Sequence, residues 1–515
     1  MKKFVDLVLV AAMLATAVPG IADSGATPPE PPQMGEGQPP ELPDGEFPGE
    51  PPEGFSDMRG EGPGGQPGEA PDGMPGGAPG GMPGGSTQPD SYNALNSYDA
   101  DAALDGEAIT STGTDENAIL VTGGAVTVTD SAITRDSDDS TGGDNASFYG
   151  VGAALLVTGG VLSVDGCAIE TDASGGTGVF AYGDGTAYVS DTIITTKQNT
   201  SGGIHVAGGG KLKAVSLTVE TFGGSAAAIR SDRGSGTMTV EGGTYTSHGS
   251  GSPAVYVTAD ISIKDAELTA TGSEALCLEG LNAVRLYNCD LSGNMPDDAQ
   301  NDNTWTVILY QSMSGDAQVG EGSFTMDGGS LISGNGGIFY TTNTDSVFVI
   351  RDVEILAENS DYFLRVTGNS NQRGWGSSGS NGANCVFTAI QQTMNGDVIY
   401  DSISNLTLYL TEGTVFTGAV LDDESCAGNG GSGAATLVID ENSQWVVTAD
   451  SVLTNLYCAG SIVDAEGRTV TIAGTDGTVY AQGESDITVT VSSYADGADT
   501  SGAGVIRDWS EYDVL

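Results

Sequence analysis

A phrase that recurs along the chain is the feature that most limits its fold. AILVTGGAVTVTDSAI at 118–133 returns as ALLVTGGVLSVDGCAI at 154–169, and degenerate copies follow with one apolar anchor each. Where no insertion intervenes, the anchors are spaced by 23 to 26 residues. The predicted anchors are Val128, Val164, Val189, Ala214, Val240, Ile263, Leu286, Met326, Ile350, Phe387, Leu410 and Ile439. A repeat of this length indicates a solenoid, in which each unit buries its apolar face against its neighbours.

Each unit has the pattern of short strands joined by turns. Val126, two positions before the anchor Val128, shows the alternation of a strand, and Ile133, five positions after the anchor, requires a bend between them. Residues that tolerate left-handed backbone torsions stand two positions after the anchors: Asp130, Gly166, Asp191, Ser216, Gly242, Asp265, Asn288, Gly328 and Asp352. We interpret these aspartates as turn formers rather than as catalysts.

A further strand precedes the glycine turn of each unit, as in AILV, ALLV, GVFA and GIHV. About three strands in each unit, with no helical periodicity, predict an all-β fold, a right-handed parallel β-helix of about a dozen coils. Neighbouring coils of such a fold lie about 4.8 Å apart. Since the end coils would expose unpaired strand edges, we expect caps at 91–110 and at about 475–515.

The N-terminal part of the chain has a different composition. MKKFVDLVLVAAMLATAVPGIADS has the charged start, short apolar run and small residues of a secretory signal peptide, which we place at 1–22. Residues 23–90 are expected to form a disordered linker rich in Pro, Gly and Met, because 17 of the 20 prolines lie there and apolar residues are few. The β-helix domain is predicted over 91–515, in a protein that is secreted or associated with the cell surface.

The net charge of the chain limits the classes of partner that it can bind. Sixty-nine acidic and sixteen basic residues give a net charge of −53, so nucleic acid is excluded as a partner. No membrane insertion is expected, because no stretch approaches eighteen consecutive apolar residues. Such a surface either attracts cations and basic partners or simply keeps the protein soluble. Six cysteines are too few for a disulfide scaffold. Cys385, Cys426 and Cys458 either pair among themselves or remain buried thiols.

The repeats GVFAYGDGTAYVSDTIITT, AAIRSDRGSGTMTVEGGTYTS and SPAVYVTADISIKDAELTA, together with the PGGMPGG linker, carry a family resemblance. The chain resembles uncharacterised, adhesin-like secreted β-helix proteins of anaerobic gut bacteria. The resemblance implies the pectate-lyase-like fold, but a fold does not by itself confer an activity.

Enzymes of the same fold have sequence patterns that this chain lacks. Polygalacturonases carry Asn-Thr-Asp before Gly-His-Gly, whereas here NTD at 343–345 follows SHG at 247–249 and no Arg-Ile-Lys is present. The Arg-x-Pro-x-x-Arg segment of the main pectate lyases is absent, as are a P-loop, HExxH and GxSxG. The sequence therefore favours a protein that is not an enzyme.

An outward-facing column on the strand before the glycine turn is the best candidate for a binding face. Aligned units place Phe180, His205, Arg230 and Tyr256 in this column, where they could stack on sugar rings or pair with uronate carboxylates. The full column is Leu120, Leu156, Phe180, His205, Arg230, Tyr256 and Cys277, and Arg233, Arg373 and Trp375 are expected to border it. The alternative is that an inserted loop covers this face and that the ladder, Trp375 included, is packing.

Acidic clusters in the insertions are candidate calcium sites. Asp136, Asp138, Asp139 and Asp144 could supply the flexible oxygen ligands that calcium prefers, although the segment matches no EF-hand loop. Similar clusters occur at 297–302 and 422–424. A solvated acidic loop without metal is the alternative.

Three functions remain open on the sequence alone. The first is a secreted, non-enzymatic β-helix that binds carbohydrate or adheres to a host or neighbouring cell surface. The second is a polysaccharide lyase or glycoside hydrolase with an atypical site around His205, Arg230 and Asp232. The third is a purely structural extracellular rod.

Overall fold

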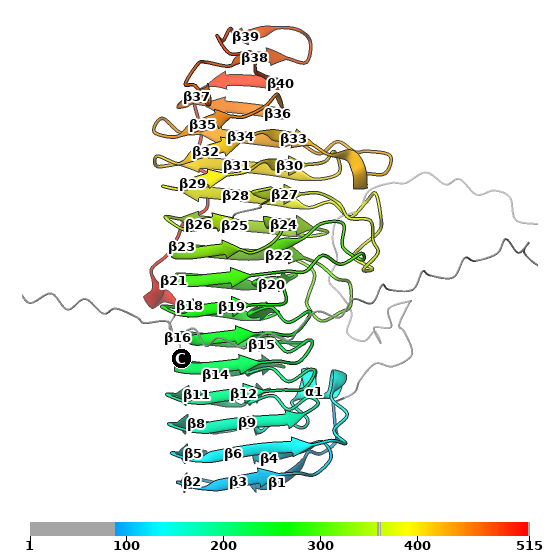
Figure 1. The fold of residues 1–515 in the computed structure, drawn as a ribbon, viewed down its shortest axis with the longest axis vertical. Helices are drawn as coiled ribbons and strands as arrows, with labels where there is room; N and C mark the ends of the chain where they lie inside the picture. Colours follow the sequence, from blue (N-terminus) through cyan, green and yellow to red (C-terminus); the bar gives the residue numbers. More distant parts are fainter. Residues whose placement is uncertain (1–87, 358–359, 361, 513–515) are drawn as a thin grey trace, which may run out of the picture. The chain divides into compact units, whose positions relative to one another are not determined.

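A computed structural model describes residues 88–357, 360 and 362–512, and these form a parallel β-helix (Figure 1). The predicted fold is confirmed. The first strand begins at Asn93, close to the predicted domain start at residue 91. The predicted signal peptide lies outside the described residues, as does the predicted linker except for 88–90. Within the described part of the chain, no helix is long and apolar enough to cross a membrane.

One long sheet, which we call sheet A, takes one strand from each coil. Its 13 strands pair in parallel, and each strand contacts the strand of the next coil. In order along the sheet, they are β1 (Asn93–Tyr98), β4 (Glu116–Val121), β7 (Leu155–Val157), β10 (Val179–Tyr182), β13 (Ile204–Ala207), β15 (Ile229–Ser231), β17 (Val255–Val257), β20 (Leu276–Glu279), β22 (Trp305–Tyr310), β24 (Gly337–Thr342), β27 (Leu364–Val366), β30 (Val398–Tyr400) and β33 (Val420–Asp422).

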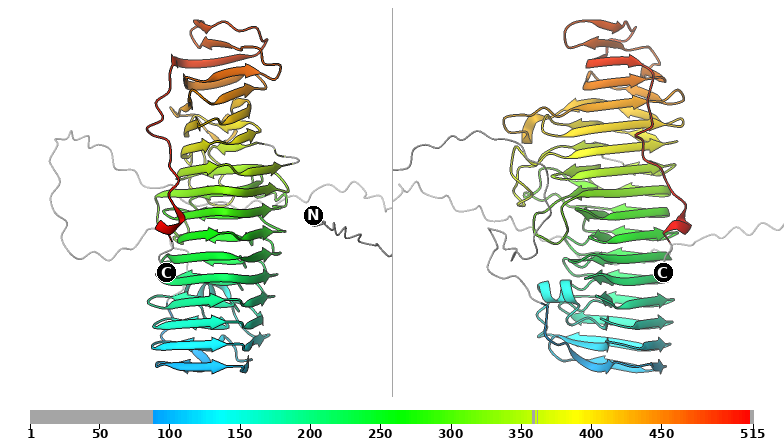
Figure 2. Two further views of the ribbon diagram at one scale, coloured as in Figure 1. Left: turned by 90° about the vertical axis from the view of Figure 1, so that its left-hand side faces the viewer. Right: turned by 180° about the vertical axis from the view of Figure 1, so that it is seen from behind.

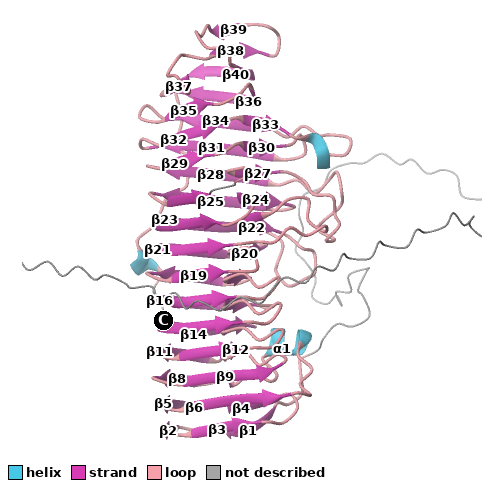
Figure 3. Ribbon diagram, in the orientation of Figure 1, coloured by secondary structure: helices cyan, strands magenta, loops and turns pink. Residues whose placement is uncertain are grey.

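The remaining strands form a 23-stranded sheet, called sheet B, and a 4-stranded sheet, called sheet C (Figure 3). The strands of sheet B are β2 (Ala102–Asp105), β3 (Ala108–Ser111), β5 (Ala125–Thr129), β6 (Ala132–Ser137), β8 (Val161–Asp165), β9 (Ala168–Ala173), β11 (Thr186–Ser190), β12 (Ile193–Thr196), β14 (Gly210–Thr221), β16 (Gly236–Ser247), β18 (Asp260–Lys264), β19 (Glu267–Ala270), β21 (Ala283–Gly293), β23 (Glu321–Ser333), β25 (Asp345–Arg351), β26 (Glu354–Ala357), β28 (Asn384–Ile390), β31 (Asn405–Thr411), β34 (Ala435–Ile439), β36 (Ser451–Cys458), β38 (Thr471–Gly474), β39 (Val479–Ala481) and β40 (Thr488–Asp496). Sheet C contains β29 (Thr393–Asn395), β32 (Val415–Gly418), β35 (Gln444–Val447) and β37 (Ser461–Asp464).

The apolar anchors stack in one column inside sheet B. Val164 pairs with both Val128 and Val189, and the same register continues to Ile350, with every anchor buried. One predicted anchor is wrong: Ile350 pairs with Ala389, and Phe387 pairs with Phe348 instead. Alternate residues of a strand face the same side, so both Phe387 and Ala389 point inward, and the long insertion before β28 hides the two-residue difference.

The bends after the anchors have the predicted left-handed backbone. All nine residues named for this role have φ between 45° and 69°. The same position in later coils is held by Gln391 (φ 50°) and Glu412 (φ 57°), which have no special tolerance for this conformation. Their neighbours therefore impose the turn, and the sequence pattern missed both.

Insertions emerge from the coils on the side of sheet A, where they pack over its outer face (Figures 1 and 2). The first contains α1 (Gly143–Tyr149) and lies between β6 and β7. Others occupy 294–304, 311–320 and 367–383, and a short one contains η1 (Glu424–Cys426). The predicted binding face is thus the face that the insertions approach.

The C-terminal segment corrects the predicted cap. Only part of 475–515 closes the last coil: β39 pairs antiparallel with β38, and β40 pairs with β36 and β38. From Gly497 the chain instead runs back along earlier coils (Figure 2) to η2 (Trp509–Glu511), which lies beside β21 (Figure 1). We call residues 497–512 the strap. Tyr287 on β21 donates a hydrogen bond to the carbonyl of Arg507 (3.0 Å), and its ring contacts Trp509 (5.5 Å between centroids).

The stacking of glycine turns can be tested in the opening repeat. A Cβ on Gly160 (φ 75°) would lie 2.3 Å from the carbonyl oxygen of Gly124 in the preceding coil. We expect Gly160→Ala to reduce the free energy of unfolding by about 3 kcal/mol, from backbone strain and overpacking. Gly413→Ala is the matched control: it has φ 92° but open space around its Cβ, so it should cost only about 1 kcal/mol. Equal losses in urea unfolding would contradict the proposed clash.

The strap should contribute stability to coils far from the C-terminal end. Removal of 498–515 exposes Tyr287 and removes the ring of Tyr512, which lies 4.1 Å from the guanidinium carbon of Arg285. We expect a lower melting midpoint and faster proteolysis near β21, because a solenoid is stabilised by contacts between neighbouring units. Cleavage that increases only around β38–β40 would show that the strap has no such role.

Candidate binding groove

The predicted outward column has the register that the sequence indicated. Phe180 pairs with His205, His205 with Arg230, Arg230 with Tyr256, and Tyr256 with Cys277. The column continues through Ile308 and Tyr340 on the next strands of sheet A. The insertions therefore decide which of these side chains can meet a ligand.

The lower end of the column is covered by the insertion that contains α1. Phe180 and His205 are fully buried, and their rings stack at 4.0 Å between centroids. Gly150 approaches so closely that a Cβ on it would lie 2.9 Å from Cγ of Phe180. Asn117 holds this insertion with hydrogen bonds from Nδ2 to the carbonyls of Gly150 and Ala153, both 2.9 Å. Phe180 and His205 therefore serve as packing in this conformation and cannot touch a ligand.

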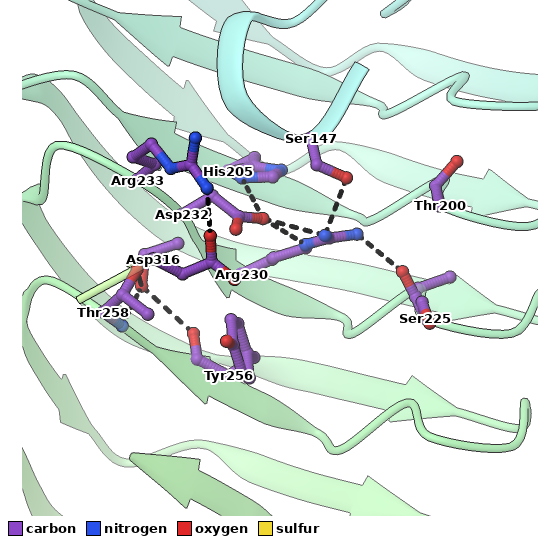
Figure 4. Close-up of polar contacts among 12 residues, drawn as sticks. Ser147, Thr200, His205, Ser225, Arg230, Asp232, Arg233, Tyr256, Thr258 and Asp316 are labelled. Carbon is purple, nitrogen blue, oxygen red and sulfur yellow. Dashed lines mark hydrogen bonds and ion pairs between the residues drawn. The ribbon is translucent and has the colours of Figure 1, made fainter. Parts of the chain in front are cut away.

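Arg230 links the column to the insertion above it (Figure 4). Its guanidinium donates from Nε to Asp232 (2.8 Å), from Nη2 to the hydroxyl of Ser147 on α1 (2.8 Å), and from Nη1 to the carbonyl of Ser225 (2.6 Å). Asp232 also lies 3.5 Å from Nε2 of His205. The guanidinium of Arg230 is therefore engaged in contacts within the protein, and its charge is neutralised by Asp232.

Burial controls the protonation of this network. Burial, together with the nearby charge of Arg230, lowers the pKa of His205 to about 4, against the opposing effect of Asp232. Burial alone would raise the pKa of Asp232, but Arg230 and His205 together hold it below its ordinary value. At neutral pH the histidine is neutral and the aspartate is ionised, so the ion pair is between Asp232 and Arg230.

Two adjoining hollows lie beyond this buried end. The first, which we call the charged hollow, has a volume of about 320 Å³ and is lined in part by Ser147, Phe148, Arg230, Asp232, Tyr256 and Asp316. The second, which we call the aromatic hollow, has a volume of about 250 Å³ and is lined in part by Tyr256, Met295, Trp305, Tyr310, Arg373 and Trp375. Tyr256 lines both hollows, together with Ser225, Gly251 and Pro253, so the two form one groove along the coils.

The aromatic hollow is walled by side chains from separate coils and from an insertion. Trp375, from the insertion after β27, lies 4.5 Å from the ring of Tyr310 and 6.0 Å from that of Trp305. Trp305 also contacts Tyr340, at 5.3 Å. Of the predicted border residues, Arg373 and Trp375 lie in this wall, and Trp375 is half-buried. Trp305, Tyr310 and Met295 were not predicted, because their inclusion depends on how the insertions fold over β22.

The charges of the groove oppose the expected pairing with uronates. Arg233 is paired with Asp316 (2.8 Å) and stacks on Phe148 (4.1 Å to the ring centroid), and Arg373 lies 3.5 Å from Asp298. The groove also presents the acidic residues Asp144 and Glu274. Each arginine that was predicted to bind a carboxylate is thus already paired with an acidic side chain, and the lining has an excess of negative charge.

Glu279 is a buried carboxyl group that sequence reasoning missed. It accepts hydrogen bonds from the hydroxyls of Tyr256 and Tyr310, both 3.3 Å, and from the amide of Ser312 (3.1 Å). Burial raises its pKa. A glutamate at the end of a strand normally indicates solvent exposure, but here Gln311 and Ser312 of the insertion at 311–320 also contact the carboxyl group. Glu279 holds the two tyrosine rings of the groove in place.

The predicted calcium ligands are not assembled into a shared site. Asp136, Asp138, Asp139 and Asp144 are all exposed. Among the described residues, no group of three or more His, Cys, Asp or Glu side chains has an arrangement that could hold a metal ion. The segment is anchored by Arg135, which donates to the hydroxyl of Ser140 (2.7 Å). All six cysteines are free thiols, so the suggested pairing among Cys385, Cys426 and Cys458 does not occur.

Comparisons with known proteins give no relative for this chain: no family model matches it, and neither the curated proteins nor the solved structures contain a match. The geometry of the groove is therefore the basis for any functional conclusion.

The buried His205 should make the protein sensitive to acid. Between pH 6.5, the ordinary pKa of histidine, and about 4, the unfolded state binds a proton that the folded state does not. The stability contributed by neutral His205 is complete above this window and is lost as the pH falls through it. Replacement by the neutral His205→Gln should reduce the loss of unfolding free energy between pH 7 and pH 4.5 by about 2 kcal/mol.

Urea unfolding of both proteins at the two pH values measures this difference. A variant as acid-sensitive as the wild type would show that His205 is already protonated in the folded state.

Proposed function

We propose that this protein binds a neutral carbohydrate in the groove over sheet A, as a non-enzymatic adhesion protein at the cell exterior. The observation that carries the proposal is the aromatic hollow: Tyr256, Tyr310, Trp305 and Trp375 line one concave site on a rigid sheet. Aromatic faces bind the apolar faces of pyranose rings, and flanking polar groups orient the hydroxyls. The signal-like N-terminus and the Pro/Gly-rich segment support an extracellular location.

The groove is suited to an extended ligand. Arg230, Tyr256, Cys277 and Ile308 lie on four consecutive strands of sheet A, a span of about 14 Å at the usual strand spacing. The excess of acidic side chains along this length disfavours polyuronates and favours uncharged sugars. Rigid coils on one side and pinned insertions on the other reduce the entropy lost on binding.

The groove offers little support for the enzyme alternative. His205 is fully buried and Asp232 is 3% exposed and paired with Arg230, so neither is placed to exchange a proton with a substrate. Glu279 is equally enclosed and occupied by hydrogen bonds from tyrosines. Binding without turnover is the function that these side chains support.

Trp375→Ala tests the proposal. Loss of a stacking ring should weaken binding to the best neutral oligosaccharide of a glycan array by at least about tenfold, with little change in melting midpoint because Trp375 is half-buried on an insertion. Tyr188→Ala is the matched control, since Tyr188 is an exposed aromatic residue on β11 outside the groove. The bound sugar is also assayed for new reducing ends and unsaturated products.

Binding without products, lost in Trp375→Ala alone, supports the proposal. Product formation would favour the enzyme, and absence of binding to every glycan would favour the structural rod.

A further inference from the structure

We infer that the sugar held in the aromatic hollow carries an N-acetyl group, an inference that rests on the proposed carbohydrate binding. The first observation is an unused donor. Trp305 is 3% exposed, lines the hollow, and its Nε1–H has no hydrogen-bond partner among the described residues. A buried N–H without an acceptor is unfavourable, so a ligand that supplies an acceptor gains a hydrogen bond on binding.

Asn301 supplies a second unused donor in the same wall. Its Oδ1 accepts a hydrogen bond from Nε of Arg373, which fixes the orientation of the amide. Nδ2 is buried and has no partner within the described chain. Asn301 and Trp305 line both the aromatic hollow and the small cavity beside it, next to Tyr340 and Trp375. Two donors without a partner therefore belong to residues that line the same hollow.

One part of the lining of the hollow is apolar. Met295, Pro296, Ile308 and Cys277 accompany the aromatic rings in its lining. Met295, Ile308 and Cys277 belong to one buried cluster with Trp305, Tyr310 and Tyr340, against which Trp375 packs. Such a surface accepts a methyl group and gains by excluding water from it. A ligand group that fits here combines a methyl with a hydrogen-bond acceptor.

The acidic side chains of the hollow favour some ligand groups over others as the source of this acceptor. A uronate carboxylate would accept both hydrogen bonds but would be repelled by Glu274 and Asp298. Arg373 does not offset this repulsion, because it is already paired with Asp298. The ammonium of a free amino sugar would suit the acids, but it has no acceptor and would leave both donors unpaired. A plain hydroxyl accepts but brings no methyl. The acetamido group is neutral, has a carbonyl acceptor and carries a methyl, so it meets all three requirements.

The test is a glycan array in which each N-acetylhexosamine oligosaccharide is accompanied by its de-N-acetylated counterpart and by the counterpart with a hydroxyl in place of the acetamido group. The full secreted protein should bind the N-acetylated members at least about tenfold more tightly than either counterpart. Equal binding of the hydroxyl counterparts would overturn this inference while leaving the proposed function standing. Preference for the de-N-acetylated members would overturn it in favour of charge recognition, and no binding at all would remove both.

Two variants examine the donors themselves. Trp305→Phe keeps an aromatic ring and removes the N–H, and Asn301→Asp keeps the acceptor for Arg373 and removes the amide donor. Each should lower affinity for the N-acetylated probe by about tenfold and change binding of the hydroxyl counterpart less than twofold. Melting curves of both variants establish that they are folded. Folded variants that retain the wild-type preference for the acetamido group would overturn the assignment of these donors.

Discussion

In-register pairing between consecutive coils is the constraint on which the rest of the structure depends. Each strand of sheet A pairs with the equivalent strand of the next coil, and each apolar anchor lies on the anchor before it. Residues with a left-handed backbone conformation, such as Asp191 (φ 45°) and Asn288 (φ 51°), keep the bend at the same place in each coil. Since side chains alternate between the two faces of a strand, the column that fills the core also fixes the column that faces outward.

Insertions convert the repetitive outer face of sheet A into a specific surface. The insertion with α1 seals Phe180 and His205, whereas those near β22 and β27 leave a groove over Tyr256. The same column of residues thus serves as packing at one end and as the floor of a groove at the other. Stacked coils provide rigidity, and the insertions, whose lengths are free to vary, provide the chemistry.

Ion pairs hold these insertions in position and at the same time define the charge of the groove. Arg230 bonds to Ser147 of α1 as well as to Asp232, and Arg233 reaches Asp316 in the insertion at 311–320. The chain has a net charge of −53, so basic residues are few. Because the arginines near the groove are already paired, the remaining acidic side chains give the groove an excess of negative charge. The described residues that line the groove therefore present aromatic rings, and the arginines among them, Arg230 and Arg373, are paired with acidic side chains.

The sequence by itself determined the repeat, the solenoid, the left-handed turns and the alignment of the outward column, because these follow from local periodicity and backbone preference. The single misplaced anchor, Phe387 for Ala389, follows an insertion that interrupts the period. Only the tertiary structure decided that His205 is sealed, that Glu279 is buried, that the strap reaches Tyr287, and that Trp305 and Asn301 share a wall with Trp375. These contacts join residues from different coils and insertions. Their positions are set by packing and ion pairs across the fold, and these cannot be predicted from the pattern within one repeat.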